Sequence, residues 1–174
     1  LYLPTTTVMM FPERLSCDLA SLMEDRLRAA LSFRVTFGAD GTLEDWEFAG
    51  SQVRVTHRLT YERADAILAA PDGTLGTALT RLLRLSETLA AARARAGGFT
   101  LSRPEPKISV CNGQVSVKLV DPNSPSRRLV SEMMVLANRL TAQYALRHDI
   151  PVIYRVQDPP SEPVHSVMRY DPVE

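Results

Sequence analysis

Cysteine and histidine are scarce in this 174-residue chain. The two cysteines, Cys17 and Cys111, lie far apart, and the three histidines are scattered. Because neither a CxxC pair nor a histidine cluster accompanies them, the sequence predicts neither a disulfide framework nor a zinc site. We interpret His57, His148 and His165 as structural or surface residues, as isolated polar side chains usually are.

An excess of charge of one sign is also missing, since 20 Lys and Arg balance 20 Asp and Glu. Nucleic-acid-binding domains are often net basic, so this balance argues against such a partner for the chain as a whole but is compatible with a local basic patch. The sequence contains no apolar run of about 20 residues, the length that spans a bilayer, and no signal peptide is recognisable. We expect a globular, cytosolic protein without membrane contact.

The chain opens on Leu-Tyr-Leu-Pro rather than on Met. We therefore expect it to be an internal part of a longer protein. Residues 1–25 are predicted to be irregular, because Pro4 and Pro12 disfavour a helix. The apolar cluster at 8–11 within this stretch is expected to pack against the rest of the domain.

Alternation of apolar and polar residues then predicts β-strands. A turn at 39–41 contains Gly41, which tolerates positive φ. Trp46 and Phe48 are expected on one face of the strand that follows this turn. Together the alternating segments predict a three-stranded antiparallel meander with strands at 31–37, 43–49 and 51–58.

Helical periodicity appears in three later segments. Thr60 is a suitable N-cap for a short helix that starts at Tyr61. Apolar residues at helical spacing predict a longer helix at 75–96, which Gly97-Gly98 ends. A second long helix is predicted at about 125–148, with an inward face formed by Leu129, Val130, Met133, Ala137, Leu140 and Tyr144.

Two further strand patterns complete the prediction. Asn112-Gly113 between alternating segments is typical of a β-hairpin at 107–120. Residues 152–156 read as a buried strand, and the remainder is expected to be extended because it is rich in proline. The predicted fold class is α+β: antiparallel strands, in a meander plus a hairpin, packed with two long helices.

No self-sufficient active site is visible in the sequence. It has no GxSxG, HExxH, P-loop or glycine-rich dinucleotide motif. The acidic pairs Glu24-Asp25 and Glu44-Asp45 lie beside turns or on solvent-facing strands, and we interpret them as solvated charges rather than metal ligands. Arginines on the 75–96 helix allow two interpretations, phosphate binding or a solvated face whose basic residues complement the helix dipole.

Five segments, in order, carry a resemblance to a known family. They are Tyr-Leu-Pro at 2–4 with the Phe-Pro-Glu-Arg-Leu-Ser-Cys-Asp-Leu-Ala-Ser-Leu stretch at 11–22, Leu-Thr-Tyr-Glu at 59–62, Arg-Pro-Glu at 103–105, Arg-Leu-Val-Ser-Glu-Met-Met-Val-Leu-Ala-Asn at 128–138, and Ile-Tyr-Arg-Val with Pro-Pro at 153–160. In motif and spacing they resemble the middle of the RNB-type catalytic domain of the ribonuclease II family. The resemblance implies that residues 1–174 are part of one such domain, incomplete at both ends.

Members of that family are Mg²⁺-dependent, processive 3′→5′ exoribonucleases that hydrolyse single-stranded RNA to nucleoside monophosphates. By resemblance, the aspartates that bind Mg²⁺ lie upstream of the family's Tyr-Leu-Pro, and its catalytic arginine lies downstream of the present chain. We therefore expect no metal ligand and no catalytic residue in this chain. We expect it to supply residues of the RNA channel, and single-stranded RNA is the implied partner. The oligomeric state is left open.

Two residues are implied as RNA contacts. Tyr61 matches the family tyrosine at the 3′-terminal nucleotide; its ring can pack on a base or ribose while its hydroxyl forms a hydrogen bond. Glu132 matches the second acid of the family's Glu-Glu pair and could accept a ribose hydroxyl. The alternatives are a tyrosine packed on the core and a solvent-facing helix glutamate. We expect a groove that joins Tyr61 to Glu132.

The sequence departs from the family pattern at several positions. Ser131 replaces the first acid of the pair, and Leu101 replaces a base-stacking aromatic, with Phe99 nearby as a substitute. Cys17 and Ala20 replace the usual Asn and Cys. These departures keep a second hypothesis open, a non-catalytic RNA-binding or scaffold domain of the same fold. A third, a protein-interaction module, predicts no salt-dependent affinity for RNA.

Overall fold

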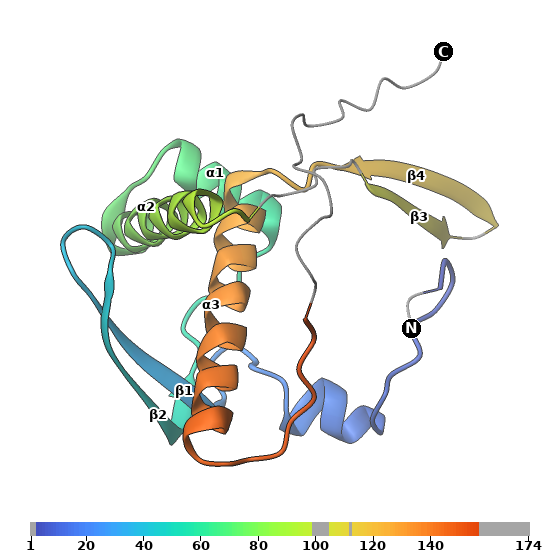
Figure 1. The fold of residues 1–174 in the computed structure, drawn as a ribbon. Coiled ribbons are helices and arrows are strands. Elements are labelled where there is room, and N and C mark those ends of the chain that lie inside the picture. The colour runs from blue at the N-terminus through green and yellow to red at the C-terminus, as the bar shows by residue number, and fades with distance from the viewer. Residues whose placement is uncertain (1–2, 99–104, 112, 157–174) are drawn as a thin grey trace.

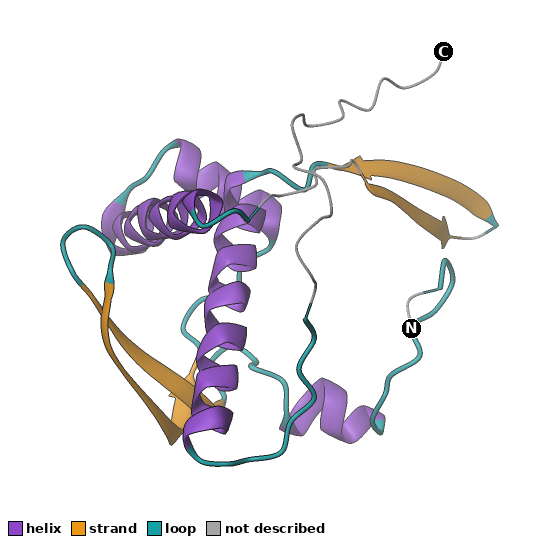
Figure 2. Ribbon diagram, viewed as in Figure 1, coloured by secondary structure: helices purple, strands orange, loops and turns teal. Residues whose placement is uncertain are grey.

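The computed structural model describes residues 3–98, 105–111 and 113–156, and these form three α-helices, two antiparallel strand pairs and one short helical turn. Figure 1 shows the long helix α3 at the centre, with α1 and α2 against its upper part and the β1–β2 ribbon beside its lower part. Figure 2 shows how loops connect these parts of the fold. The predicted α+β class with antiparallel strands is confirmed.

Strands β1 (Leu27–Phe37) and β2 (Leu43–Arg54) form the first antiparallel ribbon. The predicted turn between them is confirmed: the Gly38 amide donates to the Thr42 carbonyl at 2.8 Å, and Gly41 has a φ of 81°. The expected third strand is wrong, because β2 runs without a reversal through 50 to Arg54. Gly50 pairs with Leu31 in the ladder.

Serine hydrogen bonds help explain why β2 does not turn at Gly50. The hydroxyls of Ser32 and Ser51, which lie next to the Leu31–Gly50 pair, are 2.6 Å apart, and Ser51 also donates to the Ala30 carbonyl. A glycine accepts the extended conformation as readily as the turn conformation. The meander therefore becomes one long two-stranded ribbon.

An aromatic cluster joins the β1–β2 ribbon to α3 (Pro125–Arg147). Trp46 and Phe48 lie on one face of β2, as predicted, and both rings approach Tyr144 edge-on, with centroids 6.5 Å and 4.6 Å away. Phe33 stacks on Phe48, and the Arg147 guanidinium lies over the Trp46 ring. These contacts bury apolar surface and fix the ribbon against the C-terminal half of α3.

Helices α1 (Tyr61–Ala69) and α2 (Gly73–Arg95) form by the predicted signals. The Thr60 hydroxyl accepts the Arg63 amide at 3.2 Å and caps α1. Asp72 caps α2, which therefore begins two residues before the predicted start. Of the described residues, Ala64, Leu129, Leu140 and Ala145 form the buried apolar core.

The buried face of α3 is rotated relative to the prediction. Leu129 and Leu140 are buried as expected, but Val130 is 37% exposed. Ser126 and Glu132 take inward positions instead, at helical spacing from Leu129. Apolarity alone could not reveal this, because two of the inward-facing residues are polar.

Strands β3 (Glu105–Cys111) and β4 (Gln114–Val120) form the predicted hairpin, which extends away from the helices in Figure 1. Gly113 has a φ of 76°, as expected for its turn, whereas Asn112 lies outside the described residues. The hairpin has one apolar face, and its Ile108, Val115, Val117 and Leu119 side chains are all exposed. The amide of Val110 donates to the Pro4 carbonyl at 3.1 Å.

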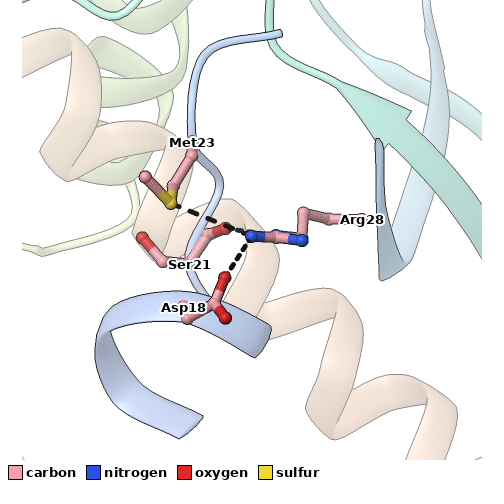
Figure 3. A network of polar contacts seen from close by, with 4 residues as sticks. All are labelled: Asp18, Ser21, Met23 and Arg28. Carbon is pink, nitrogen blue, oxygen red and sulfur yellow. Dashed lines mark hydrogen bonds and ion pairs between the residues drawn. The ribbon is translucent and has the colours of Figure 1, made fainter. Parts of the chain in front are cut away.

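The N-terminal segment departs from the expectation of an irregular loop. A short π-helical turn, η1 (Arg14–Leu19), follows Pro12, whose carbonyl accepts the amides of Leu15 and Ser16. Figure 3 shows how Arg28 of β1 holds this segment: its guanidinium donates to Asp18 at 2.5 Å and to the Ser21 carbonyl at 3.2 Å. The apolar residues 8–11 are exposed rather than packed.

The predicted strand at 152–156 is wrong as well. These residues lie outside any helix or strand and are exposed; Ile153 is fully so. A β-strand needs a neighbouring strand whose backbone groups are free to form hydrogen bonds. Among residues 3–98, 105–111 and 113–156, the segment at 152–156 pairs with no strand. In the same part of the chain, no helix has the length and apolar character needed to cross a membrane.

Candidate nucleic-acid interface

Tyr61 is positioned by the start of α1. The Thr60 cap fixes the first turn of the helix, and the Tyr61 carbonyl accepts a hydrogen bond from the Ser126 hydroxyl of α3 at 3.2 Å. The Tyr61 residue remains 38% exposed. Its backbone is therefore held by two helices while part of its side chain is available to a ligand.

The exposed part of Tyr61 lines a hollow of about 590 Å³. The Arg127 guanidinium carbon lies 4.1 Å from the Tyr61 ring centroid, a cation–π contact. We call this the Tyr61 hollow. Its lining residues come from the start of α1, the hairpin and the start of α3: Leu59, Thr60, Tyr61, Glu62, Pro106, Lys107, Val120 and Arg127.

The lining of the Tyr61 hollow contains one acid, Glu62, and two basic residues, Lys107 and Arg127. Glu62 pairs with Lys118 of β4 at 3.6 Å. Hydrogen bonds from the Glu62 amide and the Thr60 hydroxyl, followed by the charge of Lys118, lower the pKa of the Glu62 carboxyl. Within the described ranges, Lys107 and Arg127 are in no ion pair. The hollow is therefore locally basic although the chain is neutral.

Asp65 of α1 fixes the start of α3 and thereby the place of Arg127. Its carboxylate accepts the Ser126 backbone amide at 2.8 Å, which caps α3 from a neighbouring helix. Partial burial raises the pKa of Asp65, but hydrogen bonds from Ser126 and the nearby charge of Arg127 outweigh burial, so the pKa is lowered overall. The carboxylate is thus ionised at neutral pH.

Glu132 lies in a different environment. It is only 8% exposed and forms an ion pair with Arg93 of α2. The alternative of a solvent-facing glutamate is therefore wrong. Arg93 itself is half-buried rather than part of a solvated arginine face, because it reaches across to α3.

The Arg93–Glu132 pair lines a second cavity of about 640 Å³ between α2 and α3. Ser131, which replaces the first acid of the family's pair, lines the same cavity, and Arg128 pairs with Glu87 beside it at 3.6 Å. Tyr61 and Glu132 do not share a hollow: each borders α3, but in separate cavities. Among the described residues, the expected groove between them is not seen as one cavity, and the assignment of each residue to RNA remains a prediction.

Sequence reasoning missed Lys107 and Arg127. Arg127 directly precedes the motif at 128–138, and Lys107 alternates onto the polar face of a predicted hairpin, so both were visible as residue types. Their convergence on Tyr61 depends on how the hairpin and α3 meet α1, which no local pattern encodes. The described residues contain no group of three or more His, Cys, Asp or Glu that could hold a metal ion.

Comparison with known proteins gives a consistent assignment. The sequence matches the RNB domain over residues 1–170. It is 37% identical to an uncharacterized ribonuclease of Synechocystis across 94% of this chain, and 30% identical to ribonuclease R of Chlamydia muridarum across 93%. Each alignment covers 24% of the relative, so the chain spans about a quarter of the length of these relatives.

Solved structures show the same fold. Ribonuclease R of Mycoplasma genitalium in complex with double-stranded RNA superimposes with a TM-score of 0.74 at 22% identity, over 81% of this chain and 26% of that one. Its apo form gives a TM-score of 0.70. Because the family match extends over nearly all of the sequence, the chain belongs to the RNB domain family.

Proposed function

We propose that this chain is part of one RNB-type catalytic domain in a larger exoribonuclease, which hydrolyses single-stranded RNA from its 3′ end, processively and with Mg²⁺, to nucleoside monophosphates. In this proposal the chain supplies residues that contact the RNA, and the parent protein acts in the cytoplasm. The observation that carries it is the RNB domain match over residues 1–170, together with relatives that are ribonucleases R and II.

The Tyr61 hollow supports the proposed role in RNA contact. A half-exposed aromatic ring offers a stacking surface to a base, and bases stack on aromatic side chains largely without sequence preference. Basic side chains beside the ring suit the phosphates that connect the bases. Glu132 is proposed to orient a ribose hydroxyl through the carboxylate oxygen that Arg93 does not bind.

Mg²⁺ is part of the proposal for the parent protein, and its ligands are proposed to lie outside this chain. The described residues do not fit a metal site, since they hold no cluster of acidic or imidazole ligands. No chemical step is therefore assigned to residues of this chain.

A nuclease assay on the full-length parent protein tests the proposal. A single-stranded RNA labelled at its 5′ end is incubated with the protein and Mg²⁺, and the products are separated by size and by chromatography. We expect a short 5′-labelled end product to appear beside uncut RNA, with few intermediates because the enzyme is processive, together with release of nucleoside 5′-monophosphates. Cleavage at internal sites, or no cleavage at all, would contradict the exoribonuclease assignment.

The presence of Ser131 in the Glu132 cavity favours a second candidate, a non-catalytic RNA-binding or scaffold domain. A serine cannot supply the negative charge that the resemblance places there. The same assay separates the candidates: RNA binding without release of mononucleotides would support the second.

A further inference from the structure

We propose that Lys107 and Arg127 bind a phosphate of the RNA in the Tyr61 hollow, so that this hollow is a nucleotide subsite with a phosphate end and an aromatic end. The inference rests on the proposed function, because it takes RNA as the ligand. No sequence motif identified Lys107 or Arg127 as RNA contacts.

The balance of charge in the hollow points to an anionic ligand. Lys107 and Lys118 face each other directly across the hairpin, a like-charge pair that costs stability in an antiparallel ladder. Glu62 forms an ion pair with Lys118 but not with Lys107. Lys107 lines the hollow together with Arg127, and neither forms an ion pair within the described ranges. A phosphate would compensate both charges.

The other charges near Arg127 do not replace such a ligand. Asp65 offsets part of the Arg127 charge, but among the described side chains the two form no ion pair, and the Asp65 carboxylate accepts the Ser126 amide at the start of α3. Glu62 is engaged by Lys118. Within the part of the chain that the structure describes, Glu62 and Asp65 therefore already have partners, and the guanidinium edge of Arg127 retains its capacity to donate to phosphate oxygens.

The arrangement of Arg127 and Tyr61 fits a nucleotide rather than a free anion. The guanidinium covers one face of the ring and so holds the ring in place. A base that stacks on the remaining exposed part of Tyr61 carries its phosphate within the same hollow. A volume of about 590 Å³ lies within the range of small-ligand sites, on the order of 300–1,000 Å³.

A phosphate scan on the full-length protein tests the inference. Single-stranded RNAs are prepared in which one linkage near the 3′ end is a neutral methylphosphonate, and binding is measured with EDTA in place of Mg²⁺. The variants are Lys107→Ala, Arg127→Lys and the double variant Lys107→Ala/Arg127→Ala. The control is Arg34→Ala, which removes an exposed arginine of β1 that does not line the hollow.

For the wild-type protein we expect about tenfold weaker binding when the linkage in the hollow is neutral, the size of one charge-assisted hydrogen-bonded contact. The double variant should bind unmodified RNA about tenfold more weakly and lose its sensitivity to that linkage. Lys107→Ala should show a smaller loss of the same kind, whereas Arg127→Lys and Arg34→Ala should keep the wild-type sensitivity. Thermal unfolding checks that each variant is folded.

The inference is overturned if the folded double variant responds to every neutral linkage as the wild type does. If the double variant does not fold, Lys107→Ala alone decides, because an exposed lysine can be removed without loss of packing: unchanged sensitivity to every linkage overturns the inference. Failure of the proposed function looks different: a wild-type protein that does not contact RNA would not bind the oligonucleotides in EDTA, and one without catalytic activity would bind them but not shorten them when Mg²⁺ is present.

Discussion

Tyr61 combines a fixed backbone with an accessible ring. The Thr60 cap and the Ser126 hydroxyl hold its main chain, and Arg127 covers one face of its side chain. The sequence identified Tyr61 as a candidate through the Leu-Thr-Tyr-Glu segment, and its place at a helix start was predictable from Thr60. Its basic neighbours were not, because they come from β3 and α3.

Replacement of Tyr61 should weaken RNA binding through loss of the ring. We expect Tyr61→Ala in the full-length protein to lose about 1–3 kcal/mol of binding free energy, the usual value of one base–aromatic stack. Tyr61→Phe should retain most of the affinity, since it keeps the ring. Fluorescence anisotropy with labelled RNA in EDTA measures both, and wild-type affinity for Tyr61→Ala would refute the stacking role.

Glu132 and Arg93 should contribute to stability as well as to any RNA contact. Glu132→Ala leaves Arg93 half-buried without its partner, so we expect a loss of about 1–3 kcal/mol in the free energy of unfolding. Glu132→Gln should cost less because it preserves shape and a hydrogen-bond acceptor. Chemical denaturation provides the measurement, with exposed Ser131→Ala as the neighbouring control; equal stability of Glu132→Ala and wild type would exclude the structural role.

At the scale of elements, the start of α3 depends on Asp65 of α1. Asp65→Asn removes the charge that complements the helix N-terminus, so we expect about 1 kcal/mol lower stability at pH 7. The folded-state pKa of Asp65 lies below the ordinary value of 3.8. Its stabilisation is therefore present above that value and is lost as pH falls through the lower, folded-state pKa.

Unfolding midpoints of wild type and Asp65→Asn measured between pH 7 and pH 2 test this dependence. The two proteins should differ most near neutral pH, begin to converge below about pH 4, and coincide only once pH is below the folded-state pKa, where the carboxyl is protonated in both states. A difference that stays constant down to pH 2 would show that the carboxylate charge does not stabilise α3.

Elements with strong local signals were predictable from the sequence. Thr60, the Gly97-Gly98 pair and Pro125 mark helix ends. Gly41 was predictable as a turn residue, and the structure adds that this turn lies close to α2, because a Cβ added at Gly41 would overlap the Thr88 side chain. Gly50 misled the prediction because glycine suits both a turn and a long strand. Val130 misled it because Ser126 and Glu132, both polar, occupy the inward face of α3.

At the scale of the whole molecule, large apolar side chains are exposed on several elements. They include the apolar face of the β3–β4 hairpin, residues 8–11 and the segment at 152–156. A lone two-stranded hairpin is marginally stable in water. Because the chain spans about a quarter of its relatives' length, we expect other parts of the parent protein to cover the hairpin. The predicted strand at 152–156 would require such a partner too, which its sequence cannot reveal.

If other parts of the parent protein cover the apolar face of the hairpin, a polar substitution on that face should destabilise the full-length protein. Val117→Ser on the apolar face should lower the stability of the full-length protein by about 1–2 kcal/mol, although Val117 is exposed in this chain. Ser116→Ala, the adjacent residue on the opposite face, should change it by less than about 0.5 kcal/mol. Thermal unfolding of the two variants compares them, and a silent Val117→Ser would mean that solvent covers this face in the whole protein.

Photo-crosslinking tests most directly whether this chain contacts the RNA 3′ end. The full-length protein is bound in EDTA to a single-stranded RNA with 4-thiouridine as its 3′-terminal nucleotide, irradiated and digested, and crosslinked peptides are sequenced by mass spectrometry. We predict a crosslink to the peptide that contains Tyr61, and its loss in Tyr61→Ala. Efficient crosslinking confined to peptides outside residues 1–174 would show that this chain does not contact the RNA 3′ end.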